Sequence, residues 1–128
     1  MNIKGGCYCG SIRCEFEGDV TATFQCHCRE CQYFTGGHAS AAYVLPQDKF
    51  AFTKGSPARF CRSDLQEPIE RFFCADCGTQ LVAISPKRPS SFILKVGTTD
   101  DPENWTPQFA LFTCDKQPYQ TLPDSVPS

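Results

Sequence analysis

Ten cysteines among 128 residues are the side chains of this chain most able to do chemistry. Seven of them form a C-x-C pair, a C-x-C-x-x-C triplet and a C-x-x-C pair, and these are Cys7 and Cys9, then Cys26, Cys28 and Cys31, then Cys74 and Cys77. Thiolates one or two residues apart can grip one ion from a tight turn, so this spacing favours metal ligation. The alternative is buried free thiols, but paired spacing recurs on both sides of the chain.

The cellular compartment implied by the sequence also favours metal over disulfides. The chain starts Met-Asn-Ile-Lys-Gly-Gly and shows no apolar export segment, so we expect a cytoplasmic protein with reduced thiols. No run approaches the ~18 apolar residues of a membrane span. A net charge of -2 provides no field that attracts nucleic acid. We therefore expect neither a membrane nor a nucleic acid as partner.

The two outer pairs predict a closed, structural zinc site. Cys7 and Cys9 lie beside glycines, as do Cys74 and Cys77. Small neighbours let backbone amides approach and hydrogen-bond the thiolates. Four thiolates complete the tetrahedron of Zn²⁺. Such a site ties the N-terminal turn to a segment some seventy residues later, and its loss should cause unfolding.

The triplet Cys26, Cys28 and Cys31 has no fourth cysteine beside it, which predicts a second zinc with an open, catalytic position. Three thiolates on one Zn²⁺ leave a net charge of -1, which makes a weak Lewis acid toward water but a good binder of an incoming thiol. A bound substrate thiolate would then attack a small electrophile such as an aldehyde. The alternative is a second structural zinc whose fourth ligand is His27, His38 or a lone cysteine.

The remaining polar residues give weaker signals. His27 lies between two ligands and is expected to point away from the metal, and His38 is a surface residue or a substrate contact. The three lone cysteines fall in strand-like runs and are expected in the core. These are Cys14, Cys61 and Cys114. A clamp for a substrate carboxylate can come from the cationic set of Arg29, Lys54, Arg59, Arg62, Arg71 and Lys95.

Short strands must position these cysteines within a single domain of residues 1–128, which is 41% hydrophobic. Period-two alternation predicts about nine strands, with no long helix. They span residues 12–17, 20–26, 39–44, 50–53, 58–61, 69–74, 80–84, 92–96 and 109–114. One or two helical turns are expected from Cys28 to Phe34, ended by Gly36-Gly37, and a short helix at 100–105. The tail from Leu122 is expected to fray.

Three ordered motifs carry a resemblance to a known family. They are Gly5-Gly6-Cys7-Tyr8-Cys9-Gly10-Ser11-Ile12, then Cys26-His27-Cys28-Arg29-Glu30-Cys31 with Thr35-Gly36, then Arg71-Phe72-Phe73-Cys74-Ala75-Asp76-Cys77-Gly78-Thr79. From Gly5 to about Pro123 the chain resembles the glutathione-dependent formaldehyde-activating enzyme (GFA) family, whose domain is shared with centromere protein V. The resemblance implies a mainly β fold, the β-tent of packed antiparallel sheets with zinc knuckles.

The resemblance also implies two zinc ions per chain, with Cys7, Cys9, Cys74 and Cys77 holding a structural one and Cys26, Cys28 and Cys31 a catalytic one. The implied activity is condensation of glutathione with formaldehyde, a carbon–sulfur lyase reaction run in the synthetic direction. The chain has Ala110 and Tyr119 where many members have a histidine and a tryptophan. Two further hypotheses remain, a non-catalytic zinc domain that binds a protein and a redox or metal sensor.

Overall fold

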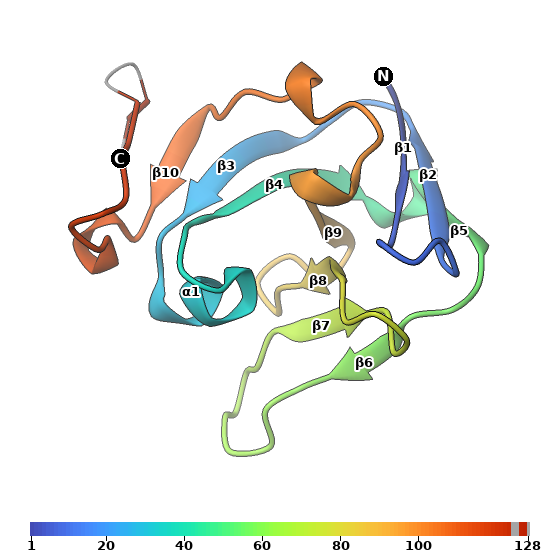
Figure 1. The fold of residues 1–128 in the computed structure, drawn as a ribbon, viewed down its shortest axis with the longest axis horizontal. Coiled ribbons are helices and arrows are strands. Elements are labelled where there is room, and N and C mark those ends of the chain that lie inside the picture. Colours follow the sequence, from blue (N-terminus) through green and yellow to red (C-terminus); the bar gives the residue numbers. More distant parts are fainter. Residues whose placement is uncertain (124–125, 128) are drawn as a thin grey trace.

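The computed structural model describes residues 1–123 and 126–127, which form two β-sheets (Figure 1). The smaller sheet has the order β1-β2-β5, with β1 (Asn2–Gly6), β2 (Arg13–Glu17) and β5 (Phe50–Lys54). The larger has the order β10-β3-β4-β9-β8-β7-β6. Its strands are β3 (Ala22–Cys26), β4 (Ser40–Pro46), β6 (Ala58–Phe60), β7 (Glu70–Phe73), β8 (Gln80–Ile84), β9 (Ser91–Lys95) and β10 (Phe109–Leu111). The predicted mainly β class with packed antiparallel sheets is confirmed.

Apolar alternation explains how the two sheets pack. Ile12, Cys14 and Phe16 are all buried, as their period-two spacing predicted, and the charged residues between them are less buried. Side chains of β2 meet the facing side of the larger sheet, where Tyr43 and Leu94 project into the same core. This core holds the sheets together and leaves the opposite face of the larger sheet free to carry a different group of residues.

That opposite face is covered by the helix α1 (Arg29–Thr35). Cys28 is its N-cap, with a side chain that accepts a hydrogen bond from the Cys31 amide, and Gly36 ends it at φ 87°, where a residue without Cβ is favoured. Each limit lies one residue later than the predicted range of Cys28 to Phe34, and the helix ends at Gly36 as predicted. A second apolar cluster, which includes Phe24, Cys26 and Cys31, fills the space around α1.

Four short 3₁₀ helices complete the described elements, namely η1 (Gln47–Lys49), η2 (Val96–Thr98), η3 (Pro102–Asn104) and η4 (Thr113–Asp115). The expected helix at 100–105 is present as η3, with its proline in the first turn. None of the helices in the described residues is long and apolar enough to span a membrane.

Two strand predictions need correction at the ends of the chain. A strand at Asn2–Gly6 was not expected, because two glycines lower its β-propensity, yet β1 pairs with all of β2. The strand expected over 109–114 stops at Leu111, because Phe112 takes a left-handed conformation at φ 53° and ψ 41° and turns the chain into η4. β10 also pairs in parallel with β3, unlike its antiparallel neighbours.

Fraying was expected from Leu122 onward. Residues 124, 125 and 128 of that tail lie outside the described residues.

Candidate metal centres

The four cysteines of the outer pairs meet at two facing turns, and we call them the clasp (Cys7, Cys9, Cys74 and Cys77). One turn follows β1 and the other joins β7 to β8. Each turn has a glycine at φ 81°, Gly10 in the first and Gly78 in the second. The Tyr8 amide donates to Thr79 Oγ1 at 3.1 Å and joins the two turns directly. The fold therefore brings together cysteines that are 65 residues apart.

The clasp has the spacing of a tetrahedral sulfur site. Its four sulfur atoms all lie within 4.8 Å of one another. Cys7 Sγ lies 3.6 Å from Cys9 Sγ, and Cys9 Sγ lies 3.7 Å from Cys74 Sγ. A tetrahedron with zinc–sulfur distances of about 2.3 Å has an edge of about 3.8 Å, so these separations fit one zinc ion.

Hydrogen-bond donors around the clasp favour the thiolate form, which a metal requires, at Cys7 and Cys77. Burial works against the Cys7 thiolate, but contacts from Ser11 Oγ and the Ile12 amide outweigh it and lower the pKa of Cys7 to about 7. The hydroxyl and amide of Thr79 lower the pKa of Cys77 to about 6. These donors also hold the sulfurs in place, as outer contacts of metal ligands do.

The other three clustered cysteines form a separate group, which we call the triplet (Cys26, Cys28 and Cys31). Cys26 is the last residue of β3, while Cys28 and Cys31 belong to the start of α1. Their sulfurs lie within 4.8 Å of one another, and among the described residues no histidine, carboxylate or lone cysteine joins them. Cys26 and Cys31 are buried and Cys28 is partly exposed. The triplet therefore offers three ligands, with one of them facing outward.

The electrostatics of the triplet favour one thiolate at Cys28 even before a metal binds. Hydrogen bonds from the Cys26 and Cys31 thiols, and from the Cys31 amide at 3.3 Å, lower the pKa of Cys28 to about 2. Contacts with the sulfurs of Cys26 and Cys28, together with burial, raise the pKa of Cys31, because neighbouring thiolates repel. A divalent cation at this point removes that repulsion, so the donor set fits a metal ion.

His27 lies inside a polar network instead of joining the triplet. Its ring is 1% exposed and its Nδ1 lies 3.2 Å from Gln120 Oε1. The Gln120 amide nitrogen donates to the Gly37 carbonyl and its Oε1 accepts from the Gln117 amide. Gln120 therefore acts as the acceptor toward His27, which carries its proton on Nδ1.

The same network fastens the C-terminal segment over α1. The Gln32 side-chain amide donates to the carbonyls of His27 and Asp115, each at 2.9 Å. Gln117 Nε2 donates to Gln32 Oε1 at 3.1 Å, and Tyr119 donates its hydroxyl to the Gly37 carbonyl. Sequence reasoning missed these glutamines, which have no recognisable spacing and become partners only when the chain end folds back.

Two cations proposed as a clamp lie on the same sheet face as the triplet. Arg71 is 4% exposed, its guanidinium lies 3.9 Å from the Phe34 ring centre, and its Nη2 is 3.3 Å from Glu30 Oε1. Lys95 donates to Ser40 Oγ at 2.7 Å. Burial lowers the pKa of Lys95, and the nearby sulfur of Cys31 works in the opposite direction.

The other four cationic candidates lie outside this cluster of buried groups. Arg29 is exposed and stacks on Tyr33, while Lys54 donates to the Gly10 carbonyl beside the clasp. Arg59 and Arg62 form exposed ion pairs with Glu70 and Asp64, respectively.

The lone cysteines and His38 have different environments. Cys14 is buried in the core between the sheets, as expected, and Cys61 is partly buried. Cys114 is exposed in η4, so its predicted core position is wrong, because the strand that would have buried it ends at Leu111. His38 is exposed and meets the edge of the Tyr119 ring.

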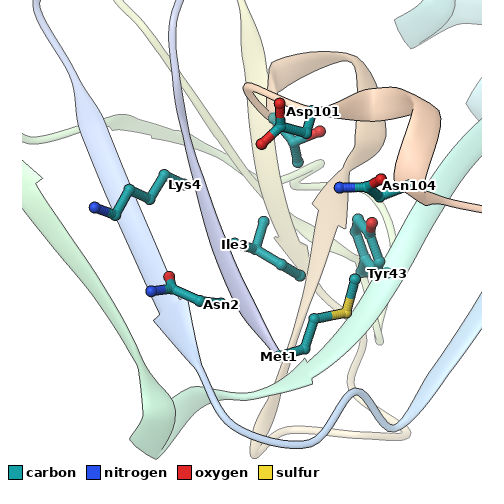
Figure 2. Close-up of a pocket in the computed structure, with 8 residues that line it drawn as sticks. Met1, Asn2, Ile3, Lys4, Tyr43, Asp101 and Asn104 are labelled. Carbon is teal, nitrogen blue, oxygen red and sulfur yellow. The ribbon is translucent and has the colours of Figure 1, made fainter.

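Two pockets lie away from both cysteine groups. Figure 2 shows the smaller one beside β1, where Met1, Ile3 and Tyr43 surround a volume of about 20 Å³. That volume holds about one water molecule. The larger, about 290 Å³, is lined by residues that include Trp105 and Gln108. Neither pocket is lined by a cysteine, so neither overlaps the clasp or the triplet.

Similarity to known proteins agrees with this geometry. A protein from Penicillium rubens is 30% identical over 112 residues, which cover 83% of this chain and 58% of that protein. One from Emericella nidulans is 29% identical over 85 residues, covering 62% of this chain and 43% of that protein. Both are provisionally named glutathione-dependent formaldehyde-activating enzymes. The chain thus spans only about half the length of these curated relatives.

The fold itself has been seen before. A crystal structure of a Rhodobacter sphaeroides protein superposes with a TM-score of 0.62 at 18% identity, covering 76% of this chain and 87% of that one. At that identity the likeness concerns the fold alone. The family model for glutathione-dependent formaldehyde-activating enzyme matches residues 2–115, which include both the clasp and the triplet. The chain therefore belongs to the glutathione-dependent formaldehyde-activating enzyme (GFA) family.

Proposed function

We propose that residues 1–128 form one zinc-binding domain that adds a small thiol, such as glutathione, to formaldehyde or a related aldehyde. In this proposal the clasp holds a structural zinc ion and the triplet a catalytic one. The observation that carries it is the contrast in ligand number, with four convergent thiols in one group and three in the other. A three-ligand set is typical of a catalytic zinc, and a four-ligand set of a structural one.

The reaction that this site would perform forms one carbon–sulfur bond. Cys26, Cys28 and Cys31 would hold the zinc ion, which would supply a centre able to bind an incoming thiol as its thiolate. The thiol sulfur bonds to the carbonyl carbon, the π pair of the C=O bond moves to oxygen, and that oxygen gains the proton that sulfur has lost. Glutathione and formaldehyde then give S-hydroxymethylglutathione, with atoms and charge balanced.

The chain's own residues would prepare this reaction by holding the ligands still. α1 presents Cys28 and Cys31 from one turn, and β3 presents Cys26 beside them. Hydrogen bonds of Gln32 and Gln120 fasten the C-terminal segment to α1 and to the turn that follows it. We assign the protein to the cytoplasm, where reduced thiols and glutathione coexist, and propose no nucleic-acid or membrane partner.

The test begins with zinc content on freshly purified, reduced protein, followed by titration with glutathione while formaldehyde consumption is measured. We expect two zinc ions per chain and consumption above the uncatalysed rate that requires the thiol. The matched variants are Cys28→Ser, which should abolish the excess rate, and Cys114→Ser, which removes an exposed thiol outside both groups and should keep it.

One zinc per chain, or two without a response to any thiol, would overturn the catalytic proposal. The chain would then be a non-catalytic zinc domain that binds a protein or senses redox state or metal.

A further inference from the structure

Lys95 lies on the same face of the larger sheet as the triplet, and it differs from Arg71, the other candidate cation on that face, in its partners. Cys26 pairs with Ser40 across β3 and β4, and Ala42 pairs with Lys95 across β4 and β9. Directly paired residues of neighbouring strands project to the same face of a sheet. Cys26, Ser40, Ala42 and Lys95 therefore share the face covered by α1, within two strands of one another.

The hydrogen bonding of Lys95 leaves its charge without a carboxylate. In the part of the chain that the structure describes, Lys95 forms no ion pair with an aspartate or glutamate, and its one side-chain hydrogen bond goes to the hydroxyl of Ser40. Ser40 is 2% exposed, so this end of Lys95 is turned inward. A partly buried ammonium group without an acidic partner is costly unless another negative group lies near.

The neighbouring cations already have partners of their own. The buried guanidinium of Arg71 is balanced by Glu30 and packs on Phe34. Arg29 is exposed, stacks on Tyr33 and donates to Gln32. Among the described residues, the triplet sulfurs are the negative groups left for Lys95. Burial and the charge of Arg71 lower the pKa of Lys95, and the charges of all three sulfurs act in the opposite direction.

The net charge of the triplet with its metal ion indicates what Lys95 does. Three thiolates and one divalent cation carry a net charge of -1, and a fourth thiolate makes it -2. The Arg71–Glu30 pair adds nothing to this sum, whereas Lys95 brings the three-thiolate group to neutrality and halves the charge of the four-thiolate group. We propose that Lys95 is the counter-charge of the triplet, and that it sets the affinity of this site for a divalent metal and for an anionic fourth ligand.

This inference rests on the proposed metal binding at the triplet but not on turnover. Lys95 is then a positioning residue. Its charge acts on the triplet sulfurs and changes their affinity for a metal, and its side chain need not contact a substrate. This role also predicts a ligand preference, since a thiolate gains more from the counter-charge than a neutral ligand does.

The experiment uses Co²⁺ as the probe metal, because thiolate-to-cobalt absorption reports each site as it fills. Reduced, metal-free protein is titrated with Co²⁺ against a competing chelator, and the Cys28→Ser variant identifies the signal of the clasp. We expect Lys95→Met to weaken cobalt binding at the triplet at least tenfold and to leave the clasp within twofold. Lys49→Met removes an exposed lysine in η1 and should leave both sites within twofold of the natural chain.

A second readout separates charge from structure. Metal-free Lys95→Met should unfold in urea at the same or a higher concentration than the natural chain, because an apolar side chain there lacks the desolvation cost of an ammonium group. In the two-cobalt protein, Lys95→Met should weaken 2-mercaptoethanol binding at least tenfold but imidazole binding less than threefold. If Lys95→Met does not fold, Lys95→Gln, which removes the charge and keeps a polar end near Ser40, decides the question by the same titrations.

Cobalt affinity at the triplet within twofold of the natural value in a folded charge-removing variant would overturn the inference. Parallel losses of metal-free stability and metal affinity would also overturn it, because they indicate a structural role. If the protein binds Co²⁺ with this dependence on Lys95 but consumes no formaldehyde, the proposed catalysis fails and the counter-charge stands.

Discussion

The clasp and the triplet both consist of cysteine thiols, but the clasp connects segments that are distant in the sequence and the triplet lies within one segment. The clasp gathers sulfurs from two turns, and the contact between Cys9 and Cys74 spans 65 residues. The three cysteines of the triplet lie within six consecutive positions, 26–31, at one strand–helix junction. In Figure 1 the β1–β2 hairpin and the β3–α1 junction lie on opposite sides of the molecule. A metal at the clasp therefore connects distant segments, whereas one at the triplet orders only its own loop.

The number of ligands sharpens this contrast. A closed group of four thiolates has no position left for substrate, and its free energy of binding is available to stabilise the fold. A local group of three contributes little to the fold and keeps a position for another ligand. The following predictions test whether stability and ligand binding separate between the two groups in this way.

The largest effect is expected from Cys74→Ser. Cys74 is 1% exposed and belongs to the clasp, so the substitution removes a ligand from the connection between the two turns. We expect a loss of about 3–5 kcal/mol in the free energy of unfolding, measured with urea in the presence of zinc. The natural chain stripped of metal by a chelator should show a similar loss. A stripped chain as stable as the zinc-loaded one would contradict the role of the clasp.

The next effect separates the triplet from the clasp. Cys28→Ser should reduce the zinc content from two ions to one per chain, while the free energy of unfolding changes by less than about 1 kcal/mol, because Cys28 is partly exposed. Elemental analysis and urea unfolding check the two parts of this prediction. If Cys28→Ser and Cys74→Ser destabilise the chain equally, the division between the two groups is wrong.

A smaller effect is expected at the network that covers α1. Gln120→Ala removes the acceptor of the buried His27 Nδ1 and the donor to Gly37, which should cost about 1–3 kcal/mol. Hydrogen exchange should increase first in α1 and near the triplet. Gln108→Ala serves as the control, because it removes the side-chain oxygen that accepts the exposed hydrogen bond of the Thr23 amide. Uniform loss of protection across both sheets would contradict a local role for Gln120.

The smallest effect is expected from an exposed ion pair between Arg13 and Asp100. Arg13 pairs with Asp100 at 2.6 Å and holds the pKa of that carboxyl below its usual range. The ion pair therefore adds to the free energy of unfolding above the ordinary carboxyl pKa of 3.8. This addition is lost as the pH falls through the lowered pKa of Asp100 in the folded chain. Asp100→Asn should cost less than about 1 kcal/mol at neutral pH and nothing well below pH 3.8, by urea unfolding. A cost that does not change with pH would exclude the ion pair as its source.

Local patterns in the sequence predicted much of this molecule because they are properties of neighbouring residues. The alternation of Ile12, Cys14 and Phe16 predicted a half-buried strand, and Gly36 predicted the end of α1. The cysteine spacings predicted two groups, and the structure brings those residues together as two clusters of sulfur atoms. Which metal they hold, and which group is catalytic, stay predictions.

Other features of the fold depend on contacts between residues far apart in the sequence, and local patterns do not predict them. β1 includes two glycines and has little strand propensity of its own, but it pairs with β2, and a Cβ on Gly5 would lie 2.3 Å from the Thr98 carbonyl oxygen. The left-handed turn at Phe112 exposes Cys114, which local apolar patterning had assigned to the core.

Sequence alone determined which cysteines could act together, because ligands separated by one or two residues are already close in any compact turn. Only the tertiary structure decided that Lys95, 64 positions after Cys31, shares a sheet face with the triplet. It also decided that Glu30 neutralises Arg71 and leaves Lys95 without a carboxylate. Charge compensation depends on distance in space and on burial, and neither is encoded in local spacing.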